Sequence, residues 1–186
     1  MSASGTVLQR WRVPLGFAAA VALIVGAHPR PLSLAAGLPI AAAGLGLRAC
    51  AAGHIRKNDA LATTGPYRFT RNPLYLGSAL LGAGFVIAAD YWLLAVLALA
   101  LLVGVYLPVI RAEEGYLAER FGAAFHEYAG RVPRLIPRFG FGGKQAGGSF
   151  SLALYRRHRE YQALAGFCFL AVVLVLKWKL HVVAPW

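Results

Sequence analysis

Apolar residues are concentrated in five stretches of the chain, separated by shorter polar segments. The stretches cover about residues 13–27, 32–53, 74–89, 91–110 and 162–176. Several approach the roughly 20 residues that a helix needs to cross a bilayer, whereas the first, third and fifth are shorter. The pattern predicts an all-α polytopic membrane helical bundle with about five transmembrane helices, within a range of roughly four to six.

Composition supports a membrane location. Of the 186 residues, 59% are hydrophobic, and the formal net charge is +12. A soluble domain of this length rarely combines so much apolar sequence with so few acids. The basic residues flank the apolar stretches and contain no nucleic-acid recognition motif. They therefore indicate membrane topology and contact with anionic lipid, and no nucleic-acid partner is expected.

The distribution of Lys and Arg predicts the orientation. With the N-terminus, the loop 54–73 and the segment 111–160 on one side, that side carries 15 of the 19 basic residues. The positive-inside rule places this side and the N-terminus in the cytoplasm, at a bacterial-type inner membrane, with the C-terminus outside. The first stretch also resembles a signal peptide, but His28-Pro-Arg-Pro31 follows where small cleavage-site residues are expected, so we favour a retained helix.

Three units are expected along the chain. Residues 1–137 form a membrane core, because Arg131-Val-Pro-Arg-Leu-Ile-Pro137 cannot continue as a regular helix. Residues 138–160 form a Gly-rich and basic connector, and 161–186 hold a C-terminal transmembrane helix with interfacial anchors and no catalytic role. Cys50 and Cys168 lack metal-like or redox-like spacing and are assigned no role.

Small residues and a short turn predict how the helices pack. Asp90-Tyr-Trp92 leaves room only for a tight antiparallel hairpin between the third and fourth stretches. Ser78, Gly82 and Gly84 on the third stretch are interpreted as packing residues in preference to a nucleotide contact. After the fourth stretch, an apolar stripe at helical spacing predicts an amphipathic helix on the membrane face; it consists of Leu117, Phe121, Phe125 and Tyr128.

Polar groups gather where the third stretch begins. Asn72 suits a helix cap and Pro73 a first helical turn, so free backbone N–H groups should face the cytoplasm. Arg68 and Arg71 lie beside this helix start, which favours an anionic group there. The hairpin's other arm brings Glu113-Glu114 back to the same face, where carboxylates are costly unless a cation compensates them. We therefore expect Arg71 and Glu114 to lie close together.

Opposite charges at one membrane face suit a zwitterionic cofactor with a cationic centre. S-adenosylmethionine carries a carboxylate, an ammonium and a sulfonium, and its methyl transfer needs closeness and alignment more than strong acid or base. A simpler interpretation also fits the spacing, in which interfacial ion pairs only hold the loop to the hairpin.

One long motif resembles a known family. Gly65-Pro-Tyr-Arg-Phe-Thr-Arg-Asn-Pro-Leu-Tyr-Leu-Gly77 is followed by Glu113-Glu114, Phe121-Gly122, Tyr128 and Val132-Pro133 through Pro137. From roughly Gly44 to Pro137, the chain resembles integral-membrane methyltransferases of the isoprenylcysteine carboxyl methyltransferase and phospholipid methyltransferase kind. The resemblance implies a cytoplasmic pocket for S-adenosylmethionine, with S-adenosylhomocysteine as product. It also implies a lipid or prenyl-type acceptor that enters from the bilayer, with no metal and no obligate protein partner.

The resemblance also implies site residues by position. The cofactor-binding set is Gly65, Pro66, Tyr67, Arg68, Arg71, Asn72, Pro73, Tyr75, Glu113, Glu114 and Tyr128, and the catalytic set is Glu113, Glu114 and Arg71. Residues 65–67 would line the adenosine region, the two glutamates would face the ammonium and sulfonium, and Tyr128 would close the site. Glu114 and Tyr75 are expected to matter most.

Asn72 is a departure from the carboxyl methyltransferases, which usually have His at this position. Asn cannot ionise, so it cannot accept a proton there, and Asn-Pro-x-Tyr is closer to the phospholipid methyltransferase pattern. A carboxylate acceptor needs no deprotonation, whereas a lipid amine must lose a proton before it attacks, with Glu113 or Glu114 as candidate base. Both acceptors remain open.

Two other classes fit some of these features. Membrane sterol and steroid reductases that use NADPH share a similar C-terminal pattern, but a 2′-phosphate calls for a basic cluster beyond Arg68 and Arg71. A non-catalytic lipid-binding protein could use the motif only to cap helices. Cofactor binding separates the three classes.

Overall fold

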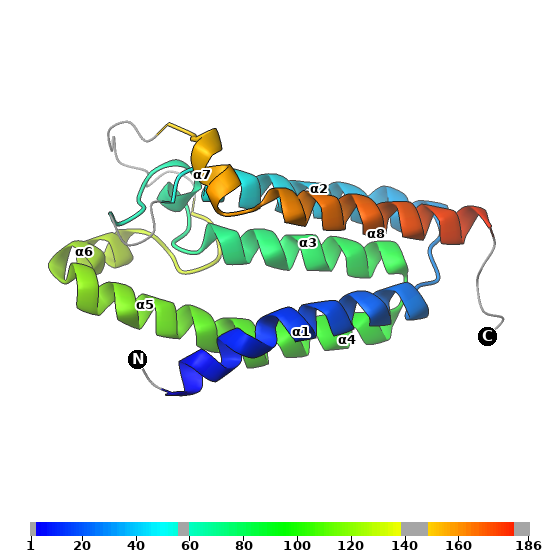
Figure 1. Cartoon of the computed structure of the whole chain (residues 1–186), viewed down its shortest axis with the longest axis horizontal. Coiled ribbons are helices and arrows are strands. Elements are labelled where there is room, and N and C mark those ends of the chain that lie inside the picture. The colour runs from blue at the N-terminus through cyan, green and yellow to red at the C-terminus, as the bar shows by residue number, and fades with distance from the viewer. Residues whose placement is uncertain (1–2, 56–59, 139–148, 181–186) are drawn as a thin grey trace.

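The computed structural model describes residues 3–55, 60–138 and 149–180, and all regular structure in these ranges is helical (Figure 1). The elements are α1 (Ala3–Gly26), α2 (Pro31–Ala52), the 3-10 helix η1 (Gly65–Arg68), α3 (Pro73–Ala89), α4 (Trp92–Leu101), the π-helix η2 (Leu102–Tyr106), α5 (Leu107–Phe121), α6 (Ala123–Arg131), α7 (Leu152–Arg157) and α8 (Tyr161–Lys179). The predicted all-α membrane fold is confirmed.

Three helices are long and apolar enough to cross a membrane. They are α2 with 22 residues, the continuous helix Trp92–Phe121 with 30, and α8 with 19. Two shorter apolar helices, Gly16–Gly26 and Pro73–Ala89, match the first and third predicted stretches. Two expectations were wrong: the fifth stretch is not short, and the fourth does not end at residue 110, because α4, η2 and α5 run on without a break.

Gly122 divides the predicted amphipathic segment into two helices. Its φ of +52° ends α5 and starts α6, a conformation that favours glycine. Phe125 on α6 is buried, whereas Leu117, Phe121 and Tyr128 are only partly buried. The predicted stripe is therefore not one continuous helix face. Part of the predicted connector is also helical, since α7 lies within 138–160, while residues 139–148 lie outside the described ranges.

The helices bring the polar loops to one end of the bundle. In Figure 1, η1, α6 and α7 lie at the end where α1 begins, and the α1–α2 and α3–α4 connections lie at the opposite end. We call the first the basic end, defined by residues 60–72 and 122–138. Asp90, with φ of +52°, ends α3 and allows the predicted tight hairpin with α4. At this opposite end, Asp90 forms an ion pair with Arg30.

The closest helix packing is between α2 and α3. A Cβ added at Gly84 would lie 2.3 Å from the Ala41 backbone nitrogen, and one at Gly37 would lie 2.4 Å from the Ala88 nitrogen. Small residues allow such backbone approach, where van der Waals contact supplies the association in lipid. Gly84 therefore has its predicted packing role. Gly82 does not, because a Cβ there would meet no atom of the described chain within 4 Å.

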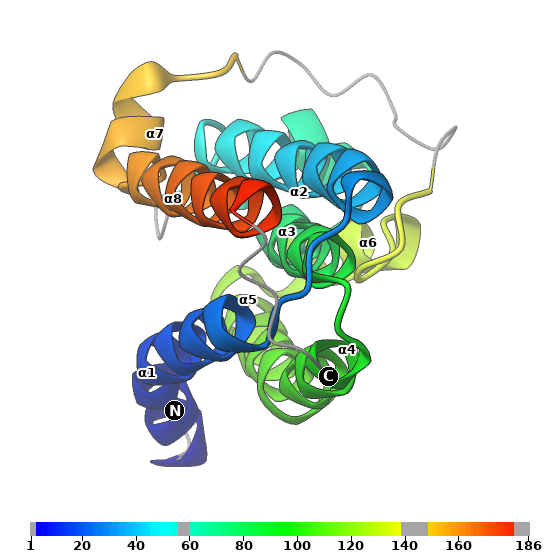
Figure 2. The ribbon, with the colours of Figure 1, turned by 90° about the vertical axis from the view of Figure 1, so that its right-hand side faces the viewer.

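The last helix packs on the outside of the bundle through one buried face. Figure 2 shows α8 lying beside α2 and above α3. Leu174 of α8 is fully buried, and Phe167 packs on Phe85 of α3 with ring centroids 5.6 Å apart. Lys177 donates a 2.7 Å hydrogen bond to the Ile24 carbonyl at the end of α1. The helix is thus packed on three others, as the sequence led us to expect.

We predict that Gly84→Ala destabilises the bundle and Gly82→Ala does not. The new methyl group at position 84 forces α2 and α3 apart, and overpacking of this kind costs about 1–3 kcal/mol. The same change at position 82 adds helix propensity in open space. Thermal unfolding in mild detergent measures both. Equal midpoints for the two variants would contradict the close packing.

Candidate cofactor site

Three segments meet at the basic end to form the candidate site. Gly65, with φ of +58°, opens η1, which buries Pro66 and Tyr67. The segment after α6 lies along this loop: the Arg71 N–H donates to the Pro133 carbonyl at 2.9 Å, and Thr70 Oγ1 donates to the Arg134 carbonyl at 3.1 Å. These bonds hold residues 69–72 against residues 133–138, with α5 as the third wall.

Glu114 of α5 lies at the centre of the site and is only 7% exposed. Its Oε1 lies 3.1 Å from Arg71 Nε and accepts a 3.0 Å hydrogen bond from Asn72 Nδ2, and its Oε2 lies 2.8 Å from Arg134 Nε. The closeness of Arg71 and Glu114 was predicted from the sequence. The contribution of Arg134 was not, because nothing in its spacing indicates that the segment folds back on α5.

Arg71 is held by more than its carboxylate partner. Its Nη1 donates to the Ala129 carbonyl at 3.2 Å, and Nη2 lies 3.5 Å from Glu114 Oε2. The Nε–H finds no well-directed acceptor in the described part of the chain, although Glu114 is near. Charge attraction therefore dominates this pair. Glu114 has two arginines and one amide around it and little capacity left for a further cation.

Glu113 has a different environment. Its Oε1 accepts a 2.8 Å hydrogen bond from the Tyr75 hydroxyl, and its side chain is partly exposed. Within the described ranges, no Lys or Arg forms an ion pair with it. Tyr75 is itself buried and packs edge-on against Tyr106 at 5.9 Å. Glu113 is thus the site carboxylate with acceptor capacity to spare, whereas the sequence favoured Glu114.

Asn72 does not act as the predicted side-chain cap. It occupies the cap position and Pro73 follows at the first turn, but its side chain makes no capping bond. Instead Nδ2 donates to Glu114 and, at 3.0 Å, to the Arg134 carbonyl. Arg68 is exposed and lies over the Phe69 ring. Of the two predicted adjacent cations, Arg71 is the one whose ion pair with Glu114 is seen in the described ranges.

Two tyrosines join the loop to α6. The Tyr128 hydroxyl donates to the Tyr67 carbonyl at 2.7 Å, while the buried Tyr67 hydroxyl has no partner in the described part of the chain. Burial raises the pKa of both hydroxyls; the charges of Glu113 and Glu160 raise the pKa of Tyr67 further, and Arg71 opposes the rise at Tyr128. Both tyrosines therefore stay neutral hydrogen-bonding groups at physiological pH.

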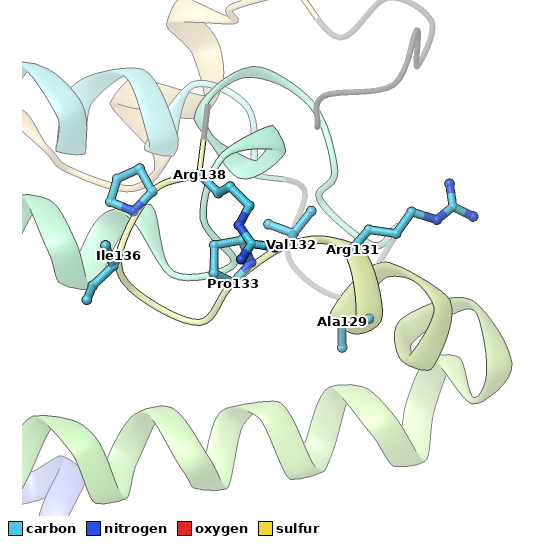
Figure 3. Close-up of a pocket in the computed structure, with 8 residues that line it drawn as sticks. Ala129, Arg131, Val132, Pro133, Ile136 and Arg138 are labelled. Carbon is cyan, nitrogen blue, oxygen red and sulfur yellow. The ribbon is translucent and has the colours of Figure 1, made fainter. Parts of the chain in front are cut away.

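A surface hollow of about 340 Å³ borders this cluster (Figure 3). It is lined by Ala129, Gly130, Arg131, Val132, Pro133, Ile136, Pro137 and Arg138. Small-molecule sites commonly have about 300–1,000 Å³. The hollow meets the cluster through the carbonyls of Ala129 and Pro133, which accept from Arg71. None of the predicted site residues lines the hollow. The sequence therefore indicated the charged residues of the site but not the residues that form this wall.

Comparison with known proteins identifies a family over part of the chain. Residues 41–124 match the phospholipid methyltransferase family. The resemblance to this family that the motif indicated is therefore confirmed. The match includes the loop, α3 and both glutamates, and it ends before Tyr128 and Arg134.

Two curated relatives are similar to the chain. The cobalt-zinc-cadmium resistance protein CzcN of Cupriavidus metallidurans is 41% identical over 140 residues, which cover 69% of this chain and 62% of the relative. The nickel-cobalt-cadmium resistance protein NccN of Alcaligenes xylosoxydans xylosoxydans is 40% identical over 85 residues, covering 45% of this chain and 38% of the relative. The chain thus spans less than two thirds of either relative. No solved structure matches it.

We predict that Glu114→Gln destabilises the protein far more than Glu113→Gln. Removing the Glu114 charge leaves Arg71 and Arg134 without their shared partner, and breaking a buried pair in this way costs about 3–5 kcal/mol. The Glu113 substitution keeps an oxygen that accepts from Tyr75. Helical circular dichroism during heating in detergent compares the two. A Glu113 variant that is as unstable as the Glu114 variant would contradict the different environments.

The two tyrosines provide a second stability test. Tyr67→Phe removes a buried hydroxyl that has no partner, so the free energy of unfolding should stay the same or rise. Tyr128→Phe removes the bond to the Tyr67 carbonyl and should cost about 1 kcal/mol. The midpoints of thermal unfolding show the order. The idea that Tyr128 fastens the loop is wrong if Tyr67→Phe is the less stable variant.

Proposed function

We propose that this protein transfers a methyl group from S-adenosylmethionine to a lipid or prenyl-type acceptor at the membrane interface. Two observations support the proposal: the family match over residues 41–124, and a carboxylate at the basic end that is hydrogen-bonded to Tyr75 without an ion-pair partner in the described ranges. The second carries it, because a site for a sulfonium and an ammonium needs an acid whose charge is not already neutralised.

The proposed roles divide the two glutamates. Glu113, oriented by Tyr75, attracts the cationic part of the cofactor. Glu114 holds Arg71 and Arg134 and thereby keeps the loop and the segment 133–138 in place. Of the residues predicted as catalytic, Glu114 and Arg71 are therefore positioning residues in this proposal.

If S-adenosylmethionine binds near the hollow, its nucleoside would lie against the wall formed by residues within 129–138. The loop residues Gly65 to Tyr67 are held beside this wall by the Tyr128 hydroxyl. On the predicted topology, the site opens toward the cytoplasm and the acceptor arrives from the bilayer. When bound, the cofactor supplies an electrophilic methyl group, and the protein's contribution is alignment and exclusion of water.

The same residues determine which group could accept a proton from the methyl acceptor. Asn72 is held by Glu114 and cannot take a proton, which leaves Glu113 as the group that would accept one from a lipid amine. A carboxylate acceptor would need no base. The names of the two relatives describe resistance to metals and no reaction, so the chemistry proposed for this chain is drawn from the family and the site.

We predict that the purified protein binds S-adenosylmethionine in the micromolar range and NADPH much more weakly. Glu113→Gln should raise the dissociation constant about 10- to 100-fold, since a hydrogen bond to a charged group is worth about 1.5–3 kcal/mol. Isothermal titration calorimetry in mild detergent measures both ligands. Glu119→Gln is the matched control, because Glu119 is an exposed residue of the same helix.

Transfer itself is tested with a labelled methyl donor. Membranes that contain the protein are incubated with it, and the lipids are separated. Base-labile label on an added prenyl-thioether acid indicates a carboxylate acceptor, whereas stable label on an aminolipid indicates an amine. A protein that retains NADPH and has no affinity for S-adenosylmethionine would overturn the methyltransferase proposal.

A further inference from the structure

A second buried ion pair lies between α2 and the start of α8. Arg48 of α2 donates to both oxygens of Glu160, at 3.1 Å from Nε and 2.7 Å from Nη2, and Glu160 is 8% exposed. Charges within membrane segments are costly unless paired, and they commonly mark functional parts of a protein. The sequence pattern indicated a role for neither residue.

Arg48 connects this pair to the start of α3. Its Nη1 donates to Ser78 Oγ, and a Cβ added at Gly77 would lie 2.7 Å from Arg48 Cγ. Ser78 in turn donates to the Leu74 carbonyl at 2.9 Å. The guanidinium therefore spans from the start of α8 to the turns of α3 that carry Tyr75.

The same C-terminal segment reaches the loop by a second route. The Phe150 ring covers Gly53 and lies edge-on to His54 with ring centroids 6.3 Å apart, and the Ser151 N–H donates to the Gly53 carbonyl at 3.0 Å. The loop also contacts His54, because a Cβ added at Gly65 would lie 2.6 Å from the His54 ring. His54 thus contacts both Phe150 and the first residue of η1.

We infer that Glu160 and Phe150 position the candidate cofactor loop, Glu160 through Arg48 and Ser78, and Phe150 through His54. This inference rests on the proposed function and deepens it. The inference assigns the C-terminal segment to the site. This segment lies outside the family match over residues 41–124 and was predicted from the sequence to be a connector and an anchor. The raised pKa of the Tyr67 hydroxyl agrees, since Glu160 lies within its electrostatic range.

The test compares Glu160→Gln and Phe150→Ala with Asp90→Asn. The last removes a more exposed arginine–carboxylate ion pair at the opposite end of the bundle, between Asp90 and Arg30. Hydrogen–deuterium exchange in detergent measures the loop amides of residues 64–72, and calorimetry measures the affinity for S-adenosylmethionine. We expect the first two variants to raise loop exchange and the dissociation constant about tenfold each, and Asp90→Asn to change neither.

The conservative variant Glu160→Asp adds a readout specific to the carboxylate, and it should restore part of the loop protection. If Glu160→Gln does not fold, Phe150→Ala decides, because it uncovers no charge. Loop exchange unchanged in folded Glu160→Gln and Phe150→Ala, or raised equally in Asp90→Asn, would overturn the positioning role. Failure of the unmodified protein to bind S-adenosylmethionine would overturn the proposed function, and the exchange data would still decide the positioning role.

Discussion

The structure depends on one buried carboxylate. Glu114 lies on a helix that crosses the apolar bundle, and it attracts Arg71 from the loop before α3 and Arg134 from the segment after α6. A buried charge in this position destabilises the protein unless it has partners of opposite charge. The two loops therefore fold so that Arg71 and Arg134 reach Glu114. Apart from this carboxylate, the chain between η1 and α3 is joined to the described chain after α6 by two backbone hydrogen bonds and by the bonds from the Thr70 and Asn72 side chains to the Arg134 carbonyl.

This constraint explains why the two neighbouring glutamates have different surroundings. Adjacent residues on a helix point about 100° apart, so Glu114 faces the loops while Glu113 faces Tyr75 on α3. A carboxylate with two arginines is electrically satisfied and suits a structural role. A carboxylate whose one hydrogen-bond partner in the described ranges is a tyrosine keeps its negative charge available for a ligand.

Much of the fold was accessible from the sequence because the bilayer limits the solutions. Long apolar stretches predict helices, the short Asp90-Tyr-Trp92 segment predicts the hairpin, and the hairpin predicts that the acids return to the loop that carries Arg71. Periodicity failed where a single residue changed the backbone, since Gly122 allows α5 to end and α6 to turn away. It also failed for α8, because the helix Tyr161–Lys179 is a few residues longer than the predicted apolar stretch 162–176.

The parts of the site that the sequence did not indicate depend on contacts between distant segments. Arg134 is one of 19 basic residues, and nothing local distinguishes it from those that only face anionic lipid. Arg48 lies inside an apolar stretch, where a charged residue is expected to have a partner, but the sequence does not indicate which residue that is. The partner is Glu160, which is more than a hundred residues away in the chain. Pairing of this kind is decided by the packing of α8 on α2, which is a tertiary property.

The two ion pairs both act on the N-terminal part of the same short helix, α3. Glu114 holds the loop that leads into α3, and Arg48 holds Ser78 on its second turn. Between them lies Tyr75, whose hydroxyl orients Glu113. Because α3 has no charged side chain within Pro73–Ala89, its position is set by these outside groups and by the glycine contacts with α2. The order of a site built on such a helix depends on the two ion pairs at the start of the helix. One of these pairs contains Glu160, so the C-terminal segment contributes to the order of the site.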